Sequence, residues 1–180
     1  MTQLTQPAFR PRILFVDDES SLREVLVELV VEALPSAEIF QARDGREALD
    51  QIQKTRFDLV VSDVRMPRMG GVELLDASRG IQPDLAFIFM SAFGDGPLIK
   101  RALELGVASF IDKPFKSETA LATILTHLEV GIKRRRIFEL LVEMSESGTG
   151  VAQEKALEAV RQLRELSFLL SVEINRGTKP

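Results

Sequence analysis

The chain has 180 residues, of which 45% are hydrophobic and 28% charged, proportions typical of a globular protein with an apolar core. Its formal net charge of −4 argues against a broad, non-specific attraction to nucleic acid or anionic lipid. The absence of cysteine excludes disulfides, thiolate metal sites and cysteine nucleophiles, and a single histidine disfavours a histidine-based zinc site. Residues 1–11 lack a signal core and no apolar run approaches the roughly 18 residues of a membrane span, so we expect a cytoplasmic protein without a membrane anchor.

Short apolar runs alternate with amphipathic segments from residue 12 onward. The first run, residues 12–16, leads into a three- and four-residue apolar repeat with Ser20 as its predicted N-cap and Pro35 beyond its end. Further strands are predicted at residues 37–42, 58–62, 85–90 and 107–111, and further helices near residues 44–54, 71–79, 96–105 and from 117 onward. Strands that are apolar at nearly every residue are typical of parallel sheets covered on both faces, so we predict a doubly wound five-stranded α/β domain over residues 10–130.

Polar side chains stand where four of these strands end. They are Asp17, Asp18, Asp63, Ser91 and Lys113. Ligand sites of such sheets lie at the carboxyl ends of the strands, so these groups are predicted to converge. Clustered carboxylates need a cation, and an oxygen-rich site suits Mg²⁺, while the ammonium and the hydroxyl suit a bound oxyanion. The pattern indicates a phosphoryl-handling site; the alternative is that each aspartate caps the helix that follows it.

Four ordered segments resemble the receiver domain of bacterial two-component response regulators, over about residues 10–130. They are residues 16–19 (VDDE), 62–67 (SDVRMP) followed by Gly70 and Gly71, 90–92 (MSA) and 110–115 (FIDKPF). The resemblance implies a flavodoxin-like sheet with strand order 2-1-3-4-5. It also implies a phosphoprotein of two-component signal transduction that receives its phosphoryl group from a sensor histidine kinase. Such a protein is a switch that catalyses its own phosphoryl transfer and dephosphorylation, and we do not expect a metabolic enzyme.

The resemblance also implies roles for individual residues. Asp63 would be the phosphoacceptor, since a carboxylate oxygen can attack phosphorus to give an aspartyl phosphate. Asp18, Asp63 and the backbone carbonyl of Arg65 would coordinate Mg²⁺, with Asp17 acting mainly through a bound water. Lys113 would pair first with the Asp63 carboxylate and then with the phosphoryl group.

The switch residues implied by the resemblance are Ser91 and Phe110. The Ser91 hydroxyl would swing toward the phosphoryl oxygens, and Phe110 would rotate inward to fill the space that opens. The peptide bond between Lys113 and Pro114 is expected to be cis. Arg65 and Phe93 occupy the positions that flank the path of attacking water in this family.

Residues 131–180 are predicted to form a helical extension. The apolar repeat of the fifth helix runs past Gly131 to Met144, residues 147–150 break it, and a second helix is expected at about residues 151–175. A heptad seam in this second segment predicts a coiled coil; it comprises Ala156, Val160, Leu163, Ser167, Leu170 and Ile174. Two helices cannot bury an apolar stripe alone, so we expect the extension to form a homodimer, to bind a partner protein or to dock on the receiver.

DNA binding by this extension is disfavoured. The run at residues 133–136 is basic, but residues 137–180 carry seven Glu against five Lys plus Arg, and the basic run is expected to be a solvated helix face. Three alternatives remain open: a transcriptional regulator with a minimal C-terminal DNA-binding unit, a phosphorelay intermediate, and the N-terminal part of a longer signalling protein. His127 is expected to be a surface histidine of the fifth helix.

Overall fold

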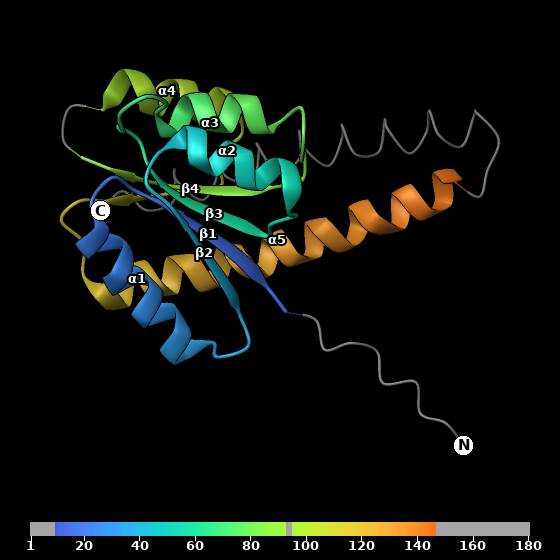
Figure 1. Cartoon of the computed structure of the whole chain (residues 1–180), viewed down its shortest axis with the longest axis horizontal. Coiled ribbons are helices and arrows are strands. Elements are labelled where there is room, and N and C mark those ends of the chain that lie inside the picture. The colour runs from blue at the N-terminus through green and yellow to red at the C-terminus, as the bar shows by residue number, and fades with distance from the viewer. Residues whose placement is uncertain (1–9, 93–94, 147–180) are drawn as a thin grey trace, which may run out of the picture.

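The computed structural model describes residues 10–92 and 95–146. Five parallel strands form one sheet, in the order β2-β1-β3-β4-β5, which confirms the predicted topology (Figure 1). The strands are β1 (Arg12–Val16), β2 (Glu38–Ala42), β3 (Leu59–Asp63), β4 (Ala86–Ser91) and β5 (Ser109–Asp112). The order reverses between β1 and β3, which places the mouth of the sheet at the carboxyl ends of these two strands.

Helices cover both faces of the sheet (Figure 1). The helices are α1 (Ser20–Ala33), α2 (Gly45–Lys54), α3 (Gly71–Ser78), α4 (Gly96–Glu104) and α5 (Ser117–Glu146). α1 and α5 pack on one face, and α2, α3 and α4 pack on the other. Successive strand residues point to opposite faces, so Ile13 and Phe15 of β1 join one core cluster while Leu14 and Val16 join the other.

Two details of α1 differ from the sequence prediction. Ser20 is the first residue of the helix, and Glu19 is the N-cap, without a side-chain capping bond. Val25, which belongs to the apolar repeat of this segment, is 45% exposed, because Leu26 and Val30 supply the buried stripe of the helix. By contrast, α2 begins at a side-chain cap, since Asp44 accepts hydrogen bonds from the N–H groups of Arg46 and Glu47.

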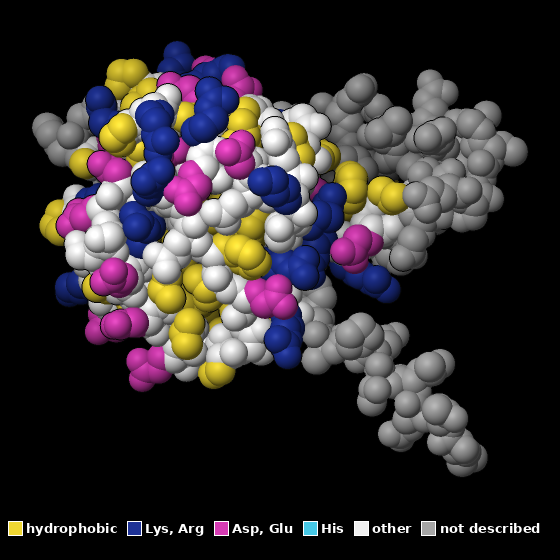
Figure 2. All heavy atoms as spheres, viewed as in Figure 1, with side chains coloured by type: hydrophobic (Ala, Val, Ile, Leu, Met, Phe, Trp, Pro, Cys, Tyr) yellow, Lys and Arg dark blue, Asp and Glu magenta, His cyan; other side chains and the backbone are white. Residues whose placement is uncertain are grey.

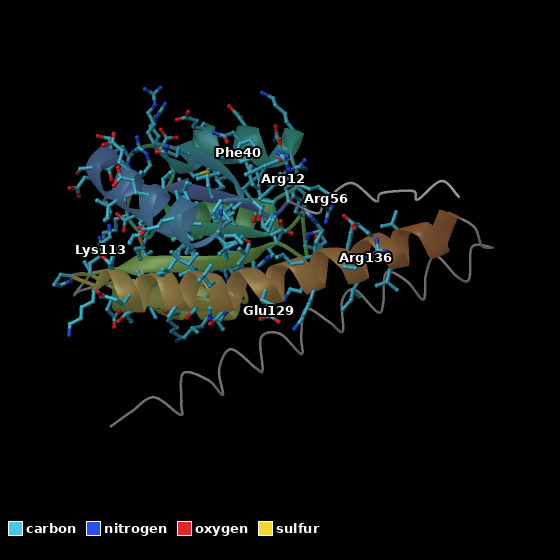
Figure 3. The ribbon with its side chains drawn as sticks, turned by 90° about the horizontal axis from the view of Figure 1, so that it is seen from below. Arg12, Phe40, Arg56, Lys113, Glu129 and Arg136 are labelled. Atoms are coloured by element: carbon cyan, nitrogen blue, oxygen red, sulfur yellow. The ribbon has the colours of Figure 1, made fainter. Side chains whose placement is uncertain are left out.

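The fifth helix continues past Gly131 to Glu146, as the apolar repeat predicts. Its first extra turns pack against the base of the sheet at Asp58, and the helix then runs on beyond the sheet, away from the end that carries Lys113 (Figure 3). Gly131 lies so close to the backbone of Asp58 that a Cβ atom would stand 2.1 Å from the Asp58 carbonyl oxygen. The guanidinium of Arg56 lies over the ring of Phe138, 4.5 Å from its centroid.

The basic run on α5 is not the solvated face that the sequence suggested. Arg135 is buried, and its guanidinium lies 3.1 Å from the buried carboxylate of Asp58, which also accepts the N–H of Arg12 at 2.7 Å. The prediction was wrong for this residue because the helix runs along the base of the sheet, where Asp58 needs a partner charge. Lys133 pairs with Glu129 on the exposed side of the helix.

His127 is half-buried on the same helix, not fully exposed. Burial and the nearby Arg134 lower the pKa of its imidazole. The predicted break at residues 147–150 and the second helix lie outside the described residues.

None of the helices in the described part of the chain has the length and apolar composition to cross a membrane. On the face shown in Figure 2, acidic and basic side chains are interspersed, so the described residues there form no continuous basic surface.

Candidate functional site

Three aspartates meet at the carboxyl ends of β1 and β3, as the sequence predicts. Asp17, Asp18 and Asp63 each offer a carboxylate oxygen, and these oxygens lie within 4.8 Å of one another. Asp17 is buried and follows β1, Asp18 is exposed, and Asp63 is the last residue of β3. A compact set of oxygen donors next to open solvent fits a hard divalent cation that keeps several water ligands.

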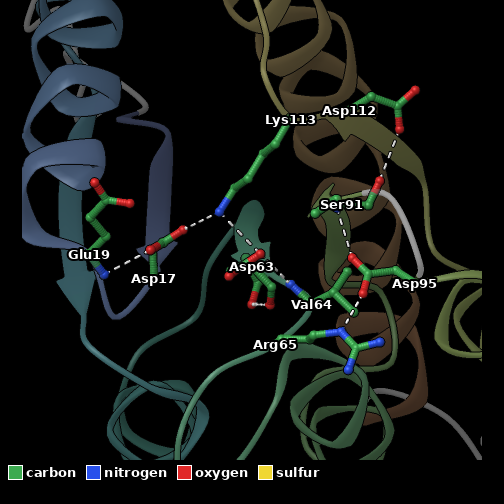
Figure 4. A network of polar contacts seen from close by, with 11 residues as sticks. Asp17, Glu19, Asp63, Val64, Arg65, Ser91, Asp95, Asp112 and Lys113 are labelled. Carbon is green, nitrogen blue, oxygen red and sulfur yellow. Dashed lines mark hydrogen bonds and ion pairs between the residues drawn. The ribbon is translucent and has the colours of Figure 1, made fainter.

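Lys113, which directly follows β5, brings an ammonium group next to two of these aspartates. Its Nζ lies 3.0 Å from Asp17 Oδ2 and 3.2 Å from Asp63 Oδ1 (Figure 4). Burial acts to lower the pKa of Lys113, but the neighbouring Asp17 and Asp63 carboxylates raise it overall. The peptide bond between Lys113 and Pro114 is cis, as expected.

The pKa of the Asp63 carboxyl group is raised. Burial is the largest cause, the neighbouring Lys113 ammonium lowers the pKa, and the like charge of Asp17 raises it further. A cation bound beside Asp63 would favour its ionised form. The donor set fits Mg²⁺.

Helix capping does not explain these aspartates. The N-caps of α1 and α3 are Glu19 and Gly70, so neither Asp17 nor Asp63 occupies a capping position. Asp17 instead accepts the N–H of Glu19 at 2.8 Å, and Asp63 accepts the N–H of Val64 at 2.9 Å. These bonds fix the direction of each carboxylate toward the shared edge.

Ser91 lies at the end of β4, but its hydroxyl points away from Asp63. It donates a hydrogen bond to Asp112 Oδ1 at 3.0 Å, and Figure 4 shows the side chain directed toward β5. The two residues face each other because β4 and β5 pair in register there. The sequence prediction missed Asp112, although the adjacency of the two strand ends could have revealed it.

Phe110 is half-buried on β5 and packs against the core cluster of the α2, α3 and α4 face. Its ring centroid lies 6.2 Å from that of Phe89, with the rings tilted by 43°. The ring thus contacts the neighbouring strand β4, which leads directly to Ser91.

Arg65 reaches across the site to Asp95, a second residue that the sequence prediction missed. The Arg65 guanidinium forms an ion pair with this carboxylate, which directly precedes α4 (Figure 4). The sequence assigns Arg65 a role through its backbone carbonyl and through its position beside the path of attacking water; the structure adds a defined partner for its side chain, Asp95. Phe93, the other residue predicted to flank that path, lies outside the described residues.

Comparison with known proteins agrees with this geometry. Residues 13–125 match the model of the response regulator receiver domain. The chain belongs to the response regulator receiver family. Receiver domains act as signalling switches and typically bind Mg²⁺ at a cluster of aspartates, and this structure contains a group of three aspartates, Asp17, Asp18 and Asp63.

Individual relatives differ in length. The chain is 36% identical over 104 residues to the sporulation initiation phosphotransferase F of Bacillus subtilis, covering 58% of this chain and 82% of that protein. It is 35% identical over 112 residues to the transcriptional regulatory protein FixJ of Bradyrhizobium diazoefficiens, covering 62% of this chain but only 54% of that protein. Among solved structures, the chemotaxis response regulator CheY4 of Vibrio cholerae is similar with a TM-score of 0.60 and 31% identity, covering 66% of this receiver chain and 99% of CheY4.

Proposed function

We propose that this receiver is phosphorylated on Asp63 and thereby switches its C-terminal helical extension. The observation that carries the proposal is the convergence of three carboxylates and the Lys113 ammonium, 3.2 Å from Asp63, at one sheet edge. A phosphohistidine of a sensor kinase is the expected donor. An oxygen of Asp63 attacks the phosphorus, the phosphorus–nitrogen bond breaks, and the imidazole keeps the electron pair.

Mg²⁺ would be held by Asp18, Asp63 and the Arg65 carbonyl, with Asp17 acting through water, and would reduce the repulsion between the anionic nucleophile and the anionic donor. Lys113 positions Asp63 before transfer and neutralises the phosphoryl charge afterwards. Ser91 would exchange its bond to Asp112 for one to a phosphoryl oxygen. Phe110 would follow inward, toward Phe89.

The test is phosphorylation of the full chain by acetyl phosphate, followed by intact mass spectrometry. Wild type should gain one phosphoryl group only with Mg²⁺ present, and Asp63→Asn should gain none. As a matched control, Asp76→Asn removes an exposed α3 carboxylate and should not affect phosphorylation. Equal labelling of Asp63→Asn and wild type would refute the assignment of the phosphoacceptor.

For the output, we propose that the extension forms a homodimer or binds a partner protein. Supporting this, α5 extends beyond the body of the receiver in Figure 1 and carries exposed Ile137 and Val142 there. DNA binding is less favoured because Arg135 is committed to Asp58 and Lys133 to Glu129. Light scattering of the full chain and of its double variant Ile137→Ser/Val142→Ser, each with and without beryllofluoride, tests this proposal. A dimer of the wild-type chain that the double variant weakens or abolishes supports it, and monomers throughout refute the homodimer.

A further inference from the structure

The two loops that flank the candidate phosphorylation site are joined by the ion pair between Arg65 and Asp95. Arg65 follows β3 and lies two residues after Asp63, whereas Asp95 precedes α4 and lies four residues after Ser91. The pair therefore connects the segment of the phosphoacceptor to the segment of the switch hydroxyl.

The two partners differ sharply in exposure. The Asp95 side chain is 3% exposed and the Arg65 side chain 64%. One carboxylate oxygen of Asp95 contacts Arg65, and the other accepts the N–H of Ala92 at 2.8 Å. A buried carboxylate requires such partners, so the ion pair with Asp95 determines where the exposed guanidinium of Arg65 lies. Figure 4 shows the guanidinium directed toward Asp95.

Two groups near Asp63 are thus engaged elsewhere in this structure. The Arg65 guanidinium is bound to Asp95, and the Ser91 hydroxyl is bound to Asp112. A phosphoryl group on Asp63 would add about −1.5 to −2 charges. Arginine binds phosphate oxygens in a bidentate manner, so that charge would compete with Asp95 for the same guanidinium.

We propose that Asp95 is a positioning residue that opposes phosphorylation of Asp63: it withholds the Arg65 guanidinium from the phosphoryl oxygens and ties the start of α4 to the loop after β3. The proposal rests on the function proposed above. A phosphoryl mimic bound at Asp63 would weaken the ion pair between Arg65 and Asp95 by some factor. Because such couplings are reciprocal, removing the Asp95 charge must tighten binding of the mimic by the same factor.

The test is the affinity of the full chain for beryllofluoride with Mg²⁺, measured by isothermal titration calorimetry in a double-mutant cycle. Asp95→Asn keeps an oxygen to accept the Ala92 N–H and removes only the charge. It should bind about fivefold more tightly than wild type, at the low end of allosteric couplings because Arg65 is exposed. In the Arg65→Gln background, the same Asp95→Asn change should have no effect. Asp76→Asn, which alters an exposed ion pair with Arg101, is the matched control and should bind as wild type does.

The cycle separates positioning from a merely structural role. Equal affinities of wild type and Asp95→Asn would overturn the proposal, and so would a gain that persists without Arg65. If wild type and Asp63→Asn both fail to bind beryllofluoride, the proposed function fails first and this inference fails with it.

A second measurement needs no variant at position 95. The Arg65 Nε–H signal of wild type, assigned in NMR spectra by its loss in Arg65→Gln, should shift when beryllofluoride and Mg²⁺ are added. An Arg65 signal that stays unchanged while the signals around Asp63 shift would overturn the proposal.

Discussion

Gly131 is the most restrictive contact between the α5 extension and the receiver. A Cβ atom at this position would lie 2.1 Å from the Asp58 carbonyl oxygen and 3.0 Å from the Asp58 carbonyl carbon. That backbone cannot retreat easily, because the Asp58 N–H donates to the Arg12 carbonyl at 2.9 Å and the Asp58 carboxylate accepts the Arg12 N–H. To restore an ordinary contact of 3.4 Å, the helix and the strand entrance must separate by about 1.3 Å.

Gly131→Ala should therefore destabilise the protein, although alanine is the better helix former. Overpacking typically costs up to about 3 kcal/mol, and the gain in helix propensity offsets about 1 kcal/mol of it. We expect a net loss of about 2 kcal/mol in the free energy of unfolding. The assay is urea denaturation of the full chain followed by far-UV circular dichroism.

Gly80→Ala, in the turn after α3, is the matched control, because a Cβ there meets only the Ala77 carbonyl oxygen at 3.9 Å, an ordinary contact. It should be neutral or stabilising by up to about 1 kcal/mol. If Gly131→Ala proves as stable as wild type, α5 does not pack on Asp58 as described.

Three further predictions concern charges. Arg135→Met leaves the Asp58 carboxylate buried without its partner, so urea denaturation should show a loss of about 3–5 kcal/mol, largely recovered in the double variant with Asp58→Asn. Since burial raises the folded-state pKa of Asp58, the Arg135→Met defect should shrink as the pH falls through that pKa and Asp58 becomes protonated; a pH-independent defect would contradict this. The folded-state pKa of His127, the only histidine in the sequence, is lowered from its ordinary value of 6.5. The contribution of His127 to stability is therefore complete above pH 6.5 and is lost as the pH falls through the lower folded-state pKa. Proton NMR should show that His127 titrates below pH 6.5, and His127→Gln should remove this pH dependence of stability. Lys113→Met removes the cation that competes with a metal at Asp63, so calorimetry should show Mg²⁺ binding roughly fivefold tighter and beryllofluoride binding weaker, whereas unchanged Mg²⁺ affinity would argue against a shared site.

Much of the fold followed from local patterns. The continuous apolar runs predicted each strand to within about two residues. The helical apolar repeat predicted that α5 continues past Gly131, because apolar periodicity reflects which face of a segment is buried. The convergence of Asp17, Asp18, Asp63 and Lys113 also followed, since parallel strands bring their carboxyl ends to one edge.

Side-chain pairing could not be predicted in the same way. The partners of Arg65, Arg135 and Ser91 come from other segments, and each pair depends on how loops and helices meet after the sheet has formed. The basic run illustrates the difference, because its composition says nothing about which arginine faces a buried carboxylate.

The alternation of strands and helices and the polar groups at the strand ends can be read from the sequence, because hydrophobic periodicity and residue order are properties of the chain. Which charges neutralise one another is seen only in the folded protein: Asp58 pairs with Arg135 at the base of the sheet, and Asp95 pairs with Arg65 beside the candidate site. An ion pair depends on the distance between the two charges and on their burial, and both are fixed only when remote segments pack together.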